Sequence, residues 1–412
     1  MSLILLIWSA LLALAVVIAF VPVRRDPITG TAFVVGWLTG ELAGQIAVID
    51  LAVVGLLLLG HAASHRIGVV GLALNAGALI GLVVLLAVGR RARRVVIESL
   101  AATPDMPITV GPEAMRPRWG RWWRVARGVP LPARSIEVTR NIDYQGDGAR
   151  RHRLDIYAPK QVGSGAPVLV YVHGGAWIIG DKREQGRPMM FELVARGWVC
   201  VAINYRLSPA ATWPDHIVDV LTAIGWVKEH IAEYGGDPSF VALAGGSAGG
   251  HLAALAALAA GDPQFQPGFE DVDTTVDACI PIYGVLDMTA DRATSGKHGP
   301  GLRILLEHRV FKKKLREHRP EFEAASPLHR IHEGAPPFLV MHGTHDTLVP
   351  VAVPRAFVPA LRAVSANPVA YVELPMAQHA FDVTASPRTS ATTAGVVAFL
   401  SAVRERTAAA RR

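Results

Sequence analysis

From residue 135 onwards, short apolar runs alternate with longer amphipathic stretches. Runs rich in β-branched and aromatic residues occur at 135–139, 153–159, 167–173, 198–204, 240–245, 278–283, 337–342 and 370–374. Helical spacing of apolar residues occupies most of the later intervals, at 184–196, 214–233, 248–260, 351–364 and 388–404. Apolar strands that alternate with helices are typical of a mostly parallel sheet with helices on both faces. The pattern predicts an α/β domain of about eight strands over residues 135–412, with an antiparallel start because no helix separates the first two runs.

One interval does not follow this alternation. Residues 286–334 lie between two predicted strands and are long and charged, and residues 302–325 have a helical pattern. A connection of this length is usually functional or contains secondary structure of its own. We expect a lid or cap over the carboxyl edge of the sheet, and a solvated helical insertion is the alternative.

Residues 1–94 have a different pattern, dominated by long apolar runs. Residues 2–23 carry no charge and are long enough to cross a bilayer, and residues 67–89 form a second such run. Residues 31–60 predict a less certain third span, because their polar side chains must face neighbouring helices or an interface. These side chains are Glu41, Gln45 and Asp50. Since no basic segment precedes the first run, a retained anchor is favoured over a cleaved signal peptide.

Arginines beside the apolar runs indicate their orientation. Arg24 and Arg25 follow the first run, and four arginines within residues 90–94 follow the last. With three spans both clusters lie on one side, which the positive-inside bias makes cytoplasmic. The sequence therefore predicts a multi-pass protein of the cell membrane with a cytoplasmic C-terminal domain. If the middle segment does not cross, the clusters fall on opposite sides and this conclusion fails.

Residues 95–134 form a connector rich in Pro, Trp and Arg. It contains Trp119, Trp122 and Trp123 among arginines, which suits either the headgroup level of a membrane or packing on the following domain. The net charge of +7 comes partly from the juxtamembrane arginines. A basic face beside a membrane favours anionic lipid headgroups, and no nucleic-acid motif accompanies it. Membrane lipids are therefore expected as partners, and nucleic acid is not.

A predicted strand-to-helix junction contains Gly245-Gly246-Ser247-Ala248-Gly249, a G-x-S-x-G pattern. On such a sharp turn the serine backbone is strained and its hydroxyl is lifted above the sheet. Small neighbours are needed because a Cβ at those positions would collide with the strand or the helix. Ser247 is therefore the candidate nucleophile.

A serine nucleophile needs a base, and the base needs an orienting acid. After a serine on this kind of turn, the acid precedes the histidine in the chain. Asp346 follows an apolar strand, and of the fifteen histidines only His379, in a loop before the last helix, comes after it. We expect Ser247, Asp346 and His379 to meet at the carboxyl edge of the sheet.

Other polar residues near these positions are weaker candidates. Asp287 also follows a strand and is the main alternative acid. His342 and His345 lie close to Asp346 but precede it. His251 follows the serine by four residues on the next helix, where a packing or supporting role is favoured.

Acyl transfer also needs preorganised backbone donors for the developing oxyanion. In VYVHGGAWIIGD (170–181), a strand ends at His173, and Gly174 and Gly175 let the chain fold close to a substrate carbonyl. The expected donors are the amides of Gly175, Ala176 and Ala248.

Five motifs together resemble the α/β-hydrolase superfamily. They are HGGAW (173–177), NYRLSP (204–209), GGSAGGHLA (245–253), HGTHD (342–346) and QHAF (378–381). The resemblance covers about residues 135–405 and is to the bacterial carboxylesterase/lipase branch related to hormone-sensitive lipase, including membrane-anchored actinobacterial esterases. That branch usually has HGGG and an acid before the nucleophile, where this chain has Ala176 and Gly246. The HGG-x-W form also occurs in arylformamidase-like and feruloyl-esterase-like relatives.

The resemblance and the motifs together predict a membrane-anchored serine hydrolase that cleaves carboxylic esters of small molecules or lipids through an acyl-serine. No cofactor or metal is expected. The two cysteines, Cys200 and Cys279, lie in apolar runs and favour buried core thiols. An arylformamidase or amidase, an acyltransferase with the same triad, and a catalytically silent membrane-tethered interaction module remain as alternatives. The oligomeric state is left open.

Overall fold

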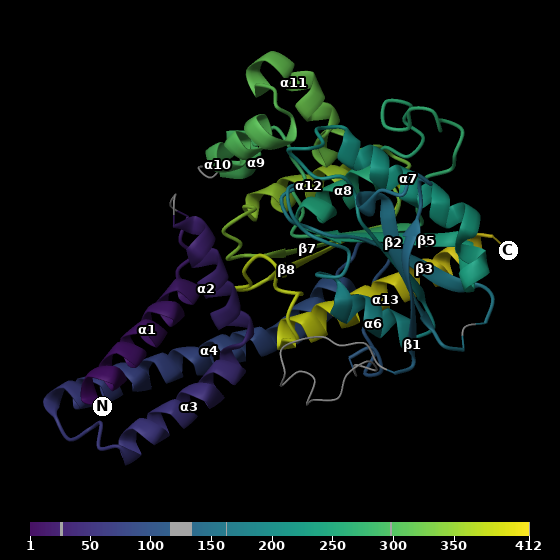
Figure 1. The fold of residues 1–412 in the computed structure, drawn as a ribbon. Coiled ribbons are helices and arrows are strands. Elements are labelled where there is room, and N and C mark those ends of the chain that lie inside the picture. Colours follow the sequence, from purple (N-terminus) through teal and green to yellow (C-terminus); the bar gives the residue numbers. More distant parts are fainter. Residues whose placement is uncertain (25–27, 116–133, 162, 297–298, 412) are drawn as a thin grey trace.

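The computed structural model describes residues 1–24, 28–115, 134–161, 163–296 and 299–411. A helical N-terminal part extends to one side of an α/β domain (Figure 1). The Trp-rich stretch of the connector, with Trp119, Trp122 and Trp123, lies outside the described residues.

An eight-stranded sheet forms the centre of the α/β domain, in the order β1-β2-β4-β3-β5-β6-β7-β8. β2 pairs antiparallel with β1 and β4, and the other pairs are parallel. The predicted mostly parallel sheet with an antiparallel start is confirmed. The strands are β1 (Ile136–Asp143), β2 (Arg153–Pro159), β3 (Ala166–Val172), β4 (Val199–Ile203), β5 (Gly236–Gly246), β6 (Ala278–Ile282), β7 (Phe338–Gly343) and β8 (Val369–Leu374).

Helices cover both faces of this sheet, because successive side chains of a strand point to opposite faces. In β3, Val168 and Val170 join the apolar core beneath α7, α8 and α12, whereas Leu169 and Tyr171 join the core beneath α6 and α13. Every residue of β3 is buried, which explains its continuous apolar sequence. The covering helices are α6 (Arg187–Val194), α7 (Asp215–His230), α8 (Ala248–Leu258), α12 (Ala352–Val364) and α13 (Pro387–Ala410).

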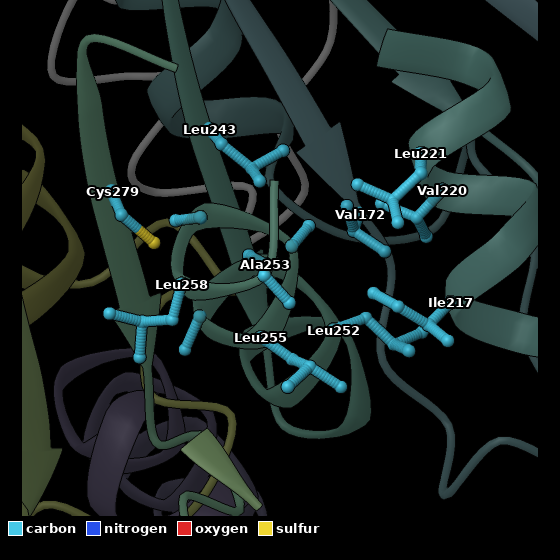
Figure 2. Packing of buried hydrophobic residues seen from close by; sticks show 14 of the residues in the cluster. Val172, Ile217, Val220, Leu221, Leu243, Leu252, Ala253, Leu255, Leu258 and Cys279 are labelled. Carbon is cyan, nitrogen blue, oxygen red and sulfur yellow. The ribbon is translucent and has the colours of Figure 1, made fainter. Parts of the chain in front are cut away.

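The first of these cores surrounds α8, the helix that follows the candidate nucleophile. Figure 2 shows Leu252 of α8 beside Val172 of β3 and Ile217 of α7. Cys279 belongs to this core and Cys200 to the opposite one, and both are free, so the predicted core thiols are confirmed. The nucleophile turn therefore stands on tightly packed secondary structure.

The described residues of the insertion 286–334 form five short helical elements. Its inner side chains Leu306, Val310 and Phe322 are fully buried and extend the first core, so the segment packs onto the domain instead of forming a separate solvated helix. The elements are α9 (Arg292–Ser295), α10 (Gly299–Leu305), η4 (Leu306–Val310), α11 (Leu315–Ala324) and η5 (Pro327–His329).

The N-terminal part consists of α1 (Ser2–Phe20), α2 (Thr29–Glu41), α3 (Ala43–Leu59) and α4 (Arg66–Ala101). By length and composition, α1 and α4 are able to cross a membrane. The predicted middle span is broken: α2 and α3 meet at an angle of 86° and make a third span only if they are counted together. The bend allows α2 to reach the α/β domain (Figure 1).

A buried acid of this helical part, Asp50, has partners on two neighbouring helices. Asp50 accepts hydrogen bonds from Trp8 Nε1 at 2.7 Å and from Asn75 Nδ2 at 2.9 Å. It therefore faces neighbouring helices, as an acid in an apolar segment requires. The side chain of Glu41 instead contacts the α/β domain.

The boundary expected at residue 94 does not end the helix. α4 continues to Ala101, and its last turns pack against α13. Val96 and Leu100, both on α4, are fully buried at this contact. Gly395 of α13 permits this contact, because a Cβ there would lie 2.7 Å from Val96 Cγ1. The first residues of the expected connector therefore continue α4 and pack on the α/β domain. Apolar residues at i and i+4 continue the helical face past the arginines.

Candidate active site

Ser247 stands alone between β5 and α8, with φ 57° and ψ −122°. This strained conformation persists because the surrounding backbone leaves no alternative. A Cβ at Gly245 would lie 2.3 Å from the Gly249 carbonyl oxygen, and one at Gly249 would lie 2.1 Å from the Val172 carbonyl oxygen. The glycines therefore bring strand, turn and helix into direct backbone contact, as the pattern predicted.

The backbone amide of Ser247 is fixed by a 2.9 Å hydrogen bond to the carbonyl of Ile282 on β6. Its hydroxyl has no hydrogen-bond partner among the described residues and lines a cavity. Such hydroxyls often form their catalytic hydrogen bond only when substrate is present.

Asp346 and His379 meet beside this turn. Asp346 follows β7 and His379 follows β8, and Asp346 Oδ2 lies 2.7 Å from His379 Nδ1. The other carboxylate oxygen accepts the amides of Leu348 at 2.9 Å and Val349 at 2.7 Å. Burial alone would raise the pKa of Asp346, but the attraction of His379 and these hydrogen bonds outweigh it and lower the pKa. The carboxylate is therefore ionised and able to orient the imidazole.

The weaker candidates Asp287 and His342 have other partners and supporting roles. Asp287 accepts hydrogen bonds from Thr289 and Thr294 and so holds the start of the insertion together. His342 Nε2 lies 2.9 Å from the Val349 carbonyl and 3.4 Å from Asp346 Oδ2. It supports the acid, and its burial lowers its pKa.

His251 is also a supporting residue, as expected from its position on α8. Its Nδ1 accepts a 3.2 Å hydrogen bond from Trp177 Nε1, and its Nε2 lies 2.8 Å from the carbonyl of Ala325. It is fully buried and links the oxyanion-loop motif to the insertion.

The HGGAW segment forms a tight turn next to Ser247. Gly175, Ala176 and Trp177 all have positive φ, at 120°, 54° and 60°. Gly175 is required here, since a Cβ on it would lie 2.0 Å from the Ile179 carbonyl oxygen. In the described part of the chain, the amides of Gly175, Ala176 and Ala248 have no acceptor, so these three candidate donors are free to bind an oxyanion.

His173 and Gly174 hold this loop in place. His173 Nδ1 lies 2.7 Å from the Gly174 carbonyl, and its ring stacks on Tyr205 with centroids 4.5 Å apart. Burial lowers the pKa of His173 to about 4, so the ring is neutral at physiological pH. The Gly174 amide donates to Gln185 Oε1 at 2.8 Å. A Cβ on Gly174 would meet Ser247 Cβ at 3.0 Å, which shows how closely loop and nucleophile approach.

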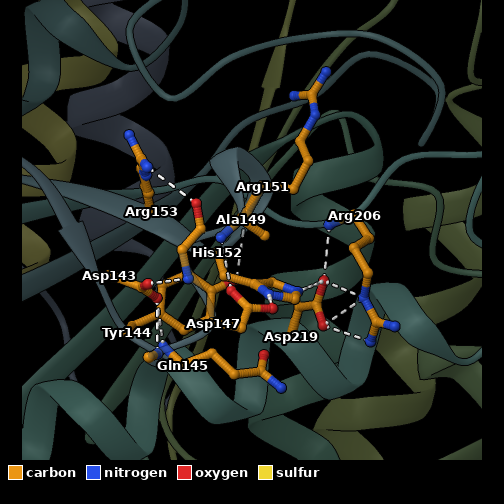
Figure 3. A network of polar contacts seen from close by, with 12 residues as sticks. Asp143, Tyr144, Gln145, Asp147, Ala149, Arg151, His152, Arg153, Arg206 and Asp219 are labelled. Atoms are coloured by element: carbon orange, nitrogen blue, oxygen red, sulfur yellow. Dashed lines mark hydrogen bonds and ion pairs between the residues drawn. The ribbon is translucent and has the colours of Figure 1, made fainter.

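The NYRLSP segment supports the loop from behind. Tyr205 donates its hydroxyl to the His173 carbonyl at 3.0 Å, and the Ser208 amide donates to the Trp177 carbonyl at 2.8 Å. Arg206 is paired with Asp219 of α7 at 2.7 Å. Figure 3 shows this pair within a network that continues through His152 to the β1–β2 turn. The network fixes the segment, and through it the oxyanion loop.

Tyr283, which follows β6, lies between the nucleophile turn and His379. Its ring centroid is 4.5 Å from that of His379, and a Cβ at Gly246 would lie 2.9 Å from its hydroxyl oxygen. The hydroxyl donates to Asp382, whose burial raises its pKa to about 6. Glycine at 246, where the related branch has an acid, is therefore required by this ring. Neither Tyr283 nor Asp382 has a local motif that would have revealed it.

The cavity at Ser247 has a volume of about 480 Å³, and four parts of the chain contribute most of its wall. The oxyanion loop contributes Ala176 and Trp177, and the acid loop contributes Thr347, Leu348 and Val349. The insertion contributes residues of α10, and the N-terminal part contributes one residue after α1 and the first residue of α2. The remaining lining residues are Arg24, Thr29, Val285, Gly301, Leu302, Ile304 and Leu305.

The N-terminal part also contacts the histidine loop directly, which the sequence analysis did not anticipate. Phe33 of α2 lies edge-on to the His379 ring at 6.0 Å between centroids, and Trp37 donates a hydrogen bond to the carbonyl of Ala380. Glu41, at the end of α2, forms a fully buried ion pair with Arg388 of α13 at 2.8 Å. No sequence pattern links these residues, since more than 300 positions separate them.

Comparisons with known proteins agree with this fold. Residues 154–361 match the BD-FAE family model. The chain is 41% identical over 411 residues to the "Probable carboxylic ester hydrolase LipM" of Mycobacterium tuberculosis, covering 97% of this chain and 93% of that protein. It is 48% identical over 287 residues to "Esterase LipQ" of the same organism, and the match covers 69% of this chain and 67% of that protein.

Two solved structures share the α/β domain. A truncated carbohydrate esterase from gut microbiota has a TM-score of 0.56 at 25% identity, covering 66% of this chain and 99% of that one. A butyrate-bound thermophilic esterase, Est2 of Thermogutta terrifontis, has a TM-score of 0.52 at 28% identity, covering 64% and 92%. The chain thus belongs to the BD-FAE family of the α/β-hydrolase superfamily, in the esterase branch related to hormone-sensitive lipase that its motifs resemble.

Proposed function

We propose that the protein is a membrane-anchored serine hydrolase that cleaves carboxylic esters. The observation that carries this proposal is the 2.7 Å contact between Asp346 and His379 beside the strained turn of Ser247. The free amides of the HGGAW turn and the apolar cavity add the two other requirements of acyl transfer, an oxyanion site and a place for the substrate. The names of the relatives LipM and LipQ, both ester hydrolases, support the same activity.

The reaction follows from these positions. Ser247 Oγ attacks the ester carbonyl while His379 Nε2 takes its proton, and Asp346 holds the Nδ1–H and stabilises the imidazolium. The amides of Gly175, Ala176 and Ala248 stabilise the oxyanion. His379 then gives its proton to the leaving alkoxide, which departs as the alcohol and leaves an acyl-serine.

Water releases the acyl group by the same route in reverse. His379 accepts a proton from the attacking water, and a second tetrahedral intermediate collapses to the carboxylic acid and free Ser247. The buried, ionised Asp346 is suited to this cycle, because it favours the imidazolium each time it forms.

The cavity supports esters with an apolar acyl or alcohol part. Its wall is formed mainly by aliphatic side chains and Trp177, which bind by removing apolar surface from water. Small-molecule and lipid esters both meet this description. We infer that the insertion acts as a cap, because Leu302 and Leu305 of α10 close one side of the cavity.

Membrane anchoring is the second part of the proposal. We propose that residues 1–94 form the membrane region, with α1 and α4 as spans and α2–α3 as a bent third, that residues 95–134 connect it, and that residues 135–412 form the catalytic domain. Exposed apolar side chains along both helices support this, among them Leu3, Leu11, Ile80 and Val83. With three spans, the positive-inside bias places the catalytic domain in the cytoplasm.

Hydrolysis of short p-nitrophenyl esters by the detergent-purified full chain tests the activity. We expect turnover by the native protein, and a loss of about 10⁴-fold or more in kcat for Ser247→Ala. A parallel assay with formanilide distinguishes an esterase from an arylformamidase or amidase, since only the latter should prefer this substrate. Undiminished ester hydrolysis by Ser247→Ala would overturn the proposal.

A further inference from the structure

Arg24 is the one charged side chain among the described residues that line the cavity at Ser247. It follows α1, where the sequence suggested only a topological signal. Instead, the side chain turns towards the catalytic domain, and one of its Nη atoms donates a hydrogen bond to the carbonyl of Asp346. The guanidinium is thereby fixed at the wall of the cavity, next to the acid of the proposed triad.

This guanidinium has an unused donor. Its Nε is buried and has no hydrogen-bond acceptor among the described residues, and in that part of the chain no carboxylate forms an ion pair with Arg24. The carboxylate of Asp346 is already engaged by His379 and two amides. A partly buried cation without a carboxylate partner is unfavourable, so a site that retains one is suited to an anionic ligand.

The surroundings of Arg24 define the kind of ligand. The hydroxyl-bearing Thr29 and Thr347 also line this cavity, together with the apolar Leu302, Ile304 and Leu348. A guanidinium offers several N–H donors in one plane, a geometry that matches carboxylate and phosphate oxygens. The cavity therefore combines an apolar part with one cationic position.

We propose that Arg24 forms a subsite for an anionic group, a carboxylate or a phosphate, on the ester substrate. The inference rests on the proposed function and narrows it to amphiphilic esters with one negatively charged end. Because α1 ends at Phe20, just before this residue, a lipid headgroup at the membrane surface can present the anion. A soluble carboxylate ester supplies the same chemistry.

Matched esters test the subsite in the detergent-purified full chain. p-Nitrophenyl butyrate is neutral, and p-nitrophenyl succinate has the same chain length and a terminal carboxylate. For Arg24→Gln we expect kcat/KM for the succinate ester to fall about tenfold or more, mainly through KM, as the loss of a charged hydrogen bond implies. Turnover of the butyrate ester should fall much less than that of the succinate ester, because the neutral ester has no anion for Arg24 to bind. Arg24→Lys should recover part of the loss.

Arg303→Gln is the matched control. Arg303 lies on α10 between the cavity-lining Leu302 and Ile304, but it contacts Ala290 and Asp291 outside the cavity. Its loss should change neither ester, which excludes a general effect of net charge. An equal loss on both esters in Arg24→Gln would show that Arg24 only holds the acid loop, and would overturn the subsite. Absence of turnover of both esters by the native protein would instead contradict the proposed function itself.

Competition experiments identify the source of the anion. Mixed micelles that contain phosphatidylglycerol are compared with micelles that contain diacylglycerol of the same acyl chains, and inorganic phosphate and free succinate are tested in plain detergent. Stronger competition by phosphatidylglycerol points to a lipid headgroup, and competition by the soluble anions points to a soluble ester. Either result supports the subsite if the competition is lost in Arg24→Gln. Competition that persists in this variant contradicts the subsite.

Discussion

Trp37 on α2 donates a 2.8 Å hydrogen bond from its indole nitrogen to the carbonyl of Ala380, the residue after His379. Ala380 has a positive φ of 62°, so the loop that carries the histidine is held in an unfavourable conformation. The N-terminal helical part therefore helps to hold the loop that carries the proposed base.

Trp37→Phe removes this hydrogen bond while keeping an aromatic side chain. The loss of one neutral hydrogen bond of about 1 kcal/mol should lower kcat about fivefold, with little change in KM, because it affects the base and not the cavity. Steady-state kinetics with p-nitrophenyl butyrate measure both constants. Trp8→Phe is the control, since Trp8 also donates its indole N–H, but to the side chain of Asp50 within the N-terminal helical part. Equal losses in both variants would argue against a specific role for Trp37.

The identity of the acid can be tested by a pair of conservative substitutions. Asp346→Asn keeps the shape of the side chain but removes the charge that favours the imidazolium, so kcat should fall by about 10⁴-fold. Asp287→Asn, which changes the other carboxylate that follows a strand, should leave most of the activity because Asp287 binds Thr289 and Thr294. A larger loss in Asp287→Asn than in Asp346→Asn would contradict the assignment.

Asp382 should make stability depend on pH. Burial raises its pKa to about 6 from an ordinary 3.8, so between these values the folded state binds a proton that the unfolded state releases. Its contribution to the free energy of unfolding therefore falls as pH rises from about 4 to about 6, by up to about 3 kcal/mol.

Asp382→Asn removes this titration and still accepts a hydrogen bond from Tyr283. The variant should be more stable than the native protein at pH 8, with the difference vanishing towards pH 4. Thermal unfolding in detergent at both pH values measures it. A variant that is equally stable or less stable at pH 8 would show that the buried carboxyl is not held in this protonation state.

Gly246→Ala tests the explanation for the residue before the nucleophile. The added Cβ would meet the ring of Tyr283 at 2.9–3.0 Å, and this ring contacts His379. We expect a loss of about 1–3 kcal/mol in stability, as for other overpacked sites, together with lower kcat. Gly111→Ala is the control, because a Cβ there meets nothing within 4 Å. Unchanged kinetics in Gly246→Ala would mean that the ring moves freely.

The sequence pattern was sufficient to predict the α/β domain and the places of Ser247, Asp346 and His379 after strands of its sheet. Strands are predicted by short apolar runs, and the strained turn requires glycines next to the serine. Both features therefore depend on residues that are neighbours in the sequence. The bend between α2 and α3 could hardly be predicted from the sequence. Glu41 and Asp50 showed that this segment contains polar residues, but the sequence does not show what they contact. Their partners, Arg388 and Trp8, become evident only in three dimensions.

The same limit explains what was missed around the site. From the sequence, Arg24 indicated only the orientation of the helices in a membrane, because a sequence shows that a residue is charged but not where its side chain points. Phe33 and Trp37 resembled ordinary apolar residues of a membrane helix. Their contacts with the histidine loop depend on how the helical part sits against the α/β domain, which no local periodicity encodes.

Covalent labelling of Ser247 tests the central claim most directly. The full chain in detergent is treated with a fluorophosphonate, which reacts with an activated serine, and the modified peptide is identified by mass spectrometry. We predict one adduct, on Ser247, that is lost in Ser247→Ala and strongly reduced in Asp346→Asn. Labelling of a different serine, or no labelling of a native protein that hydrolyses esters, would contradict the account.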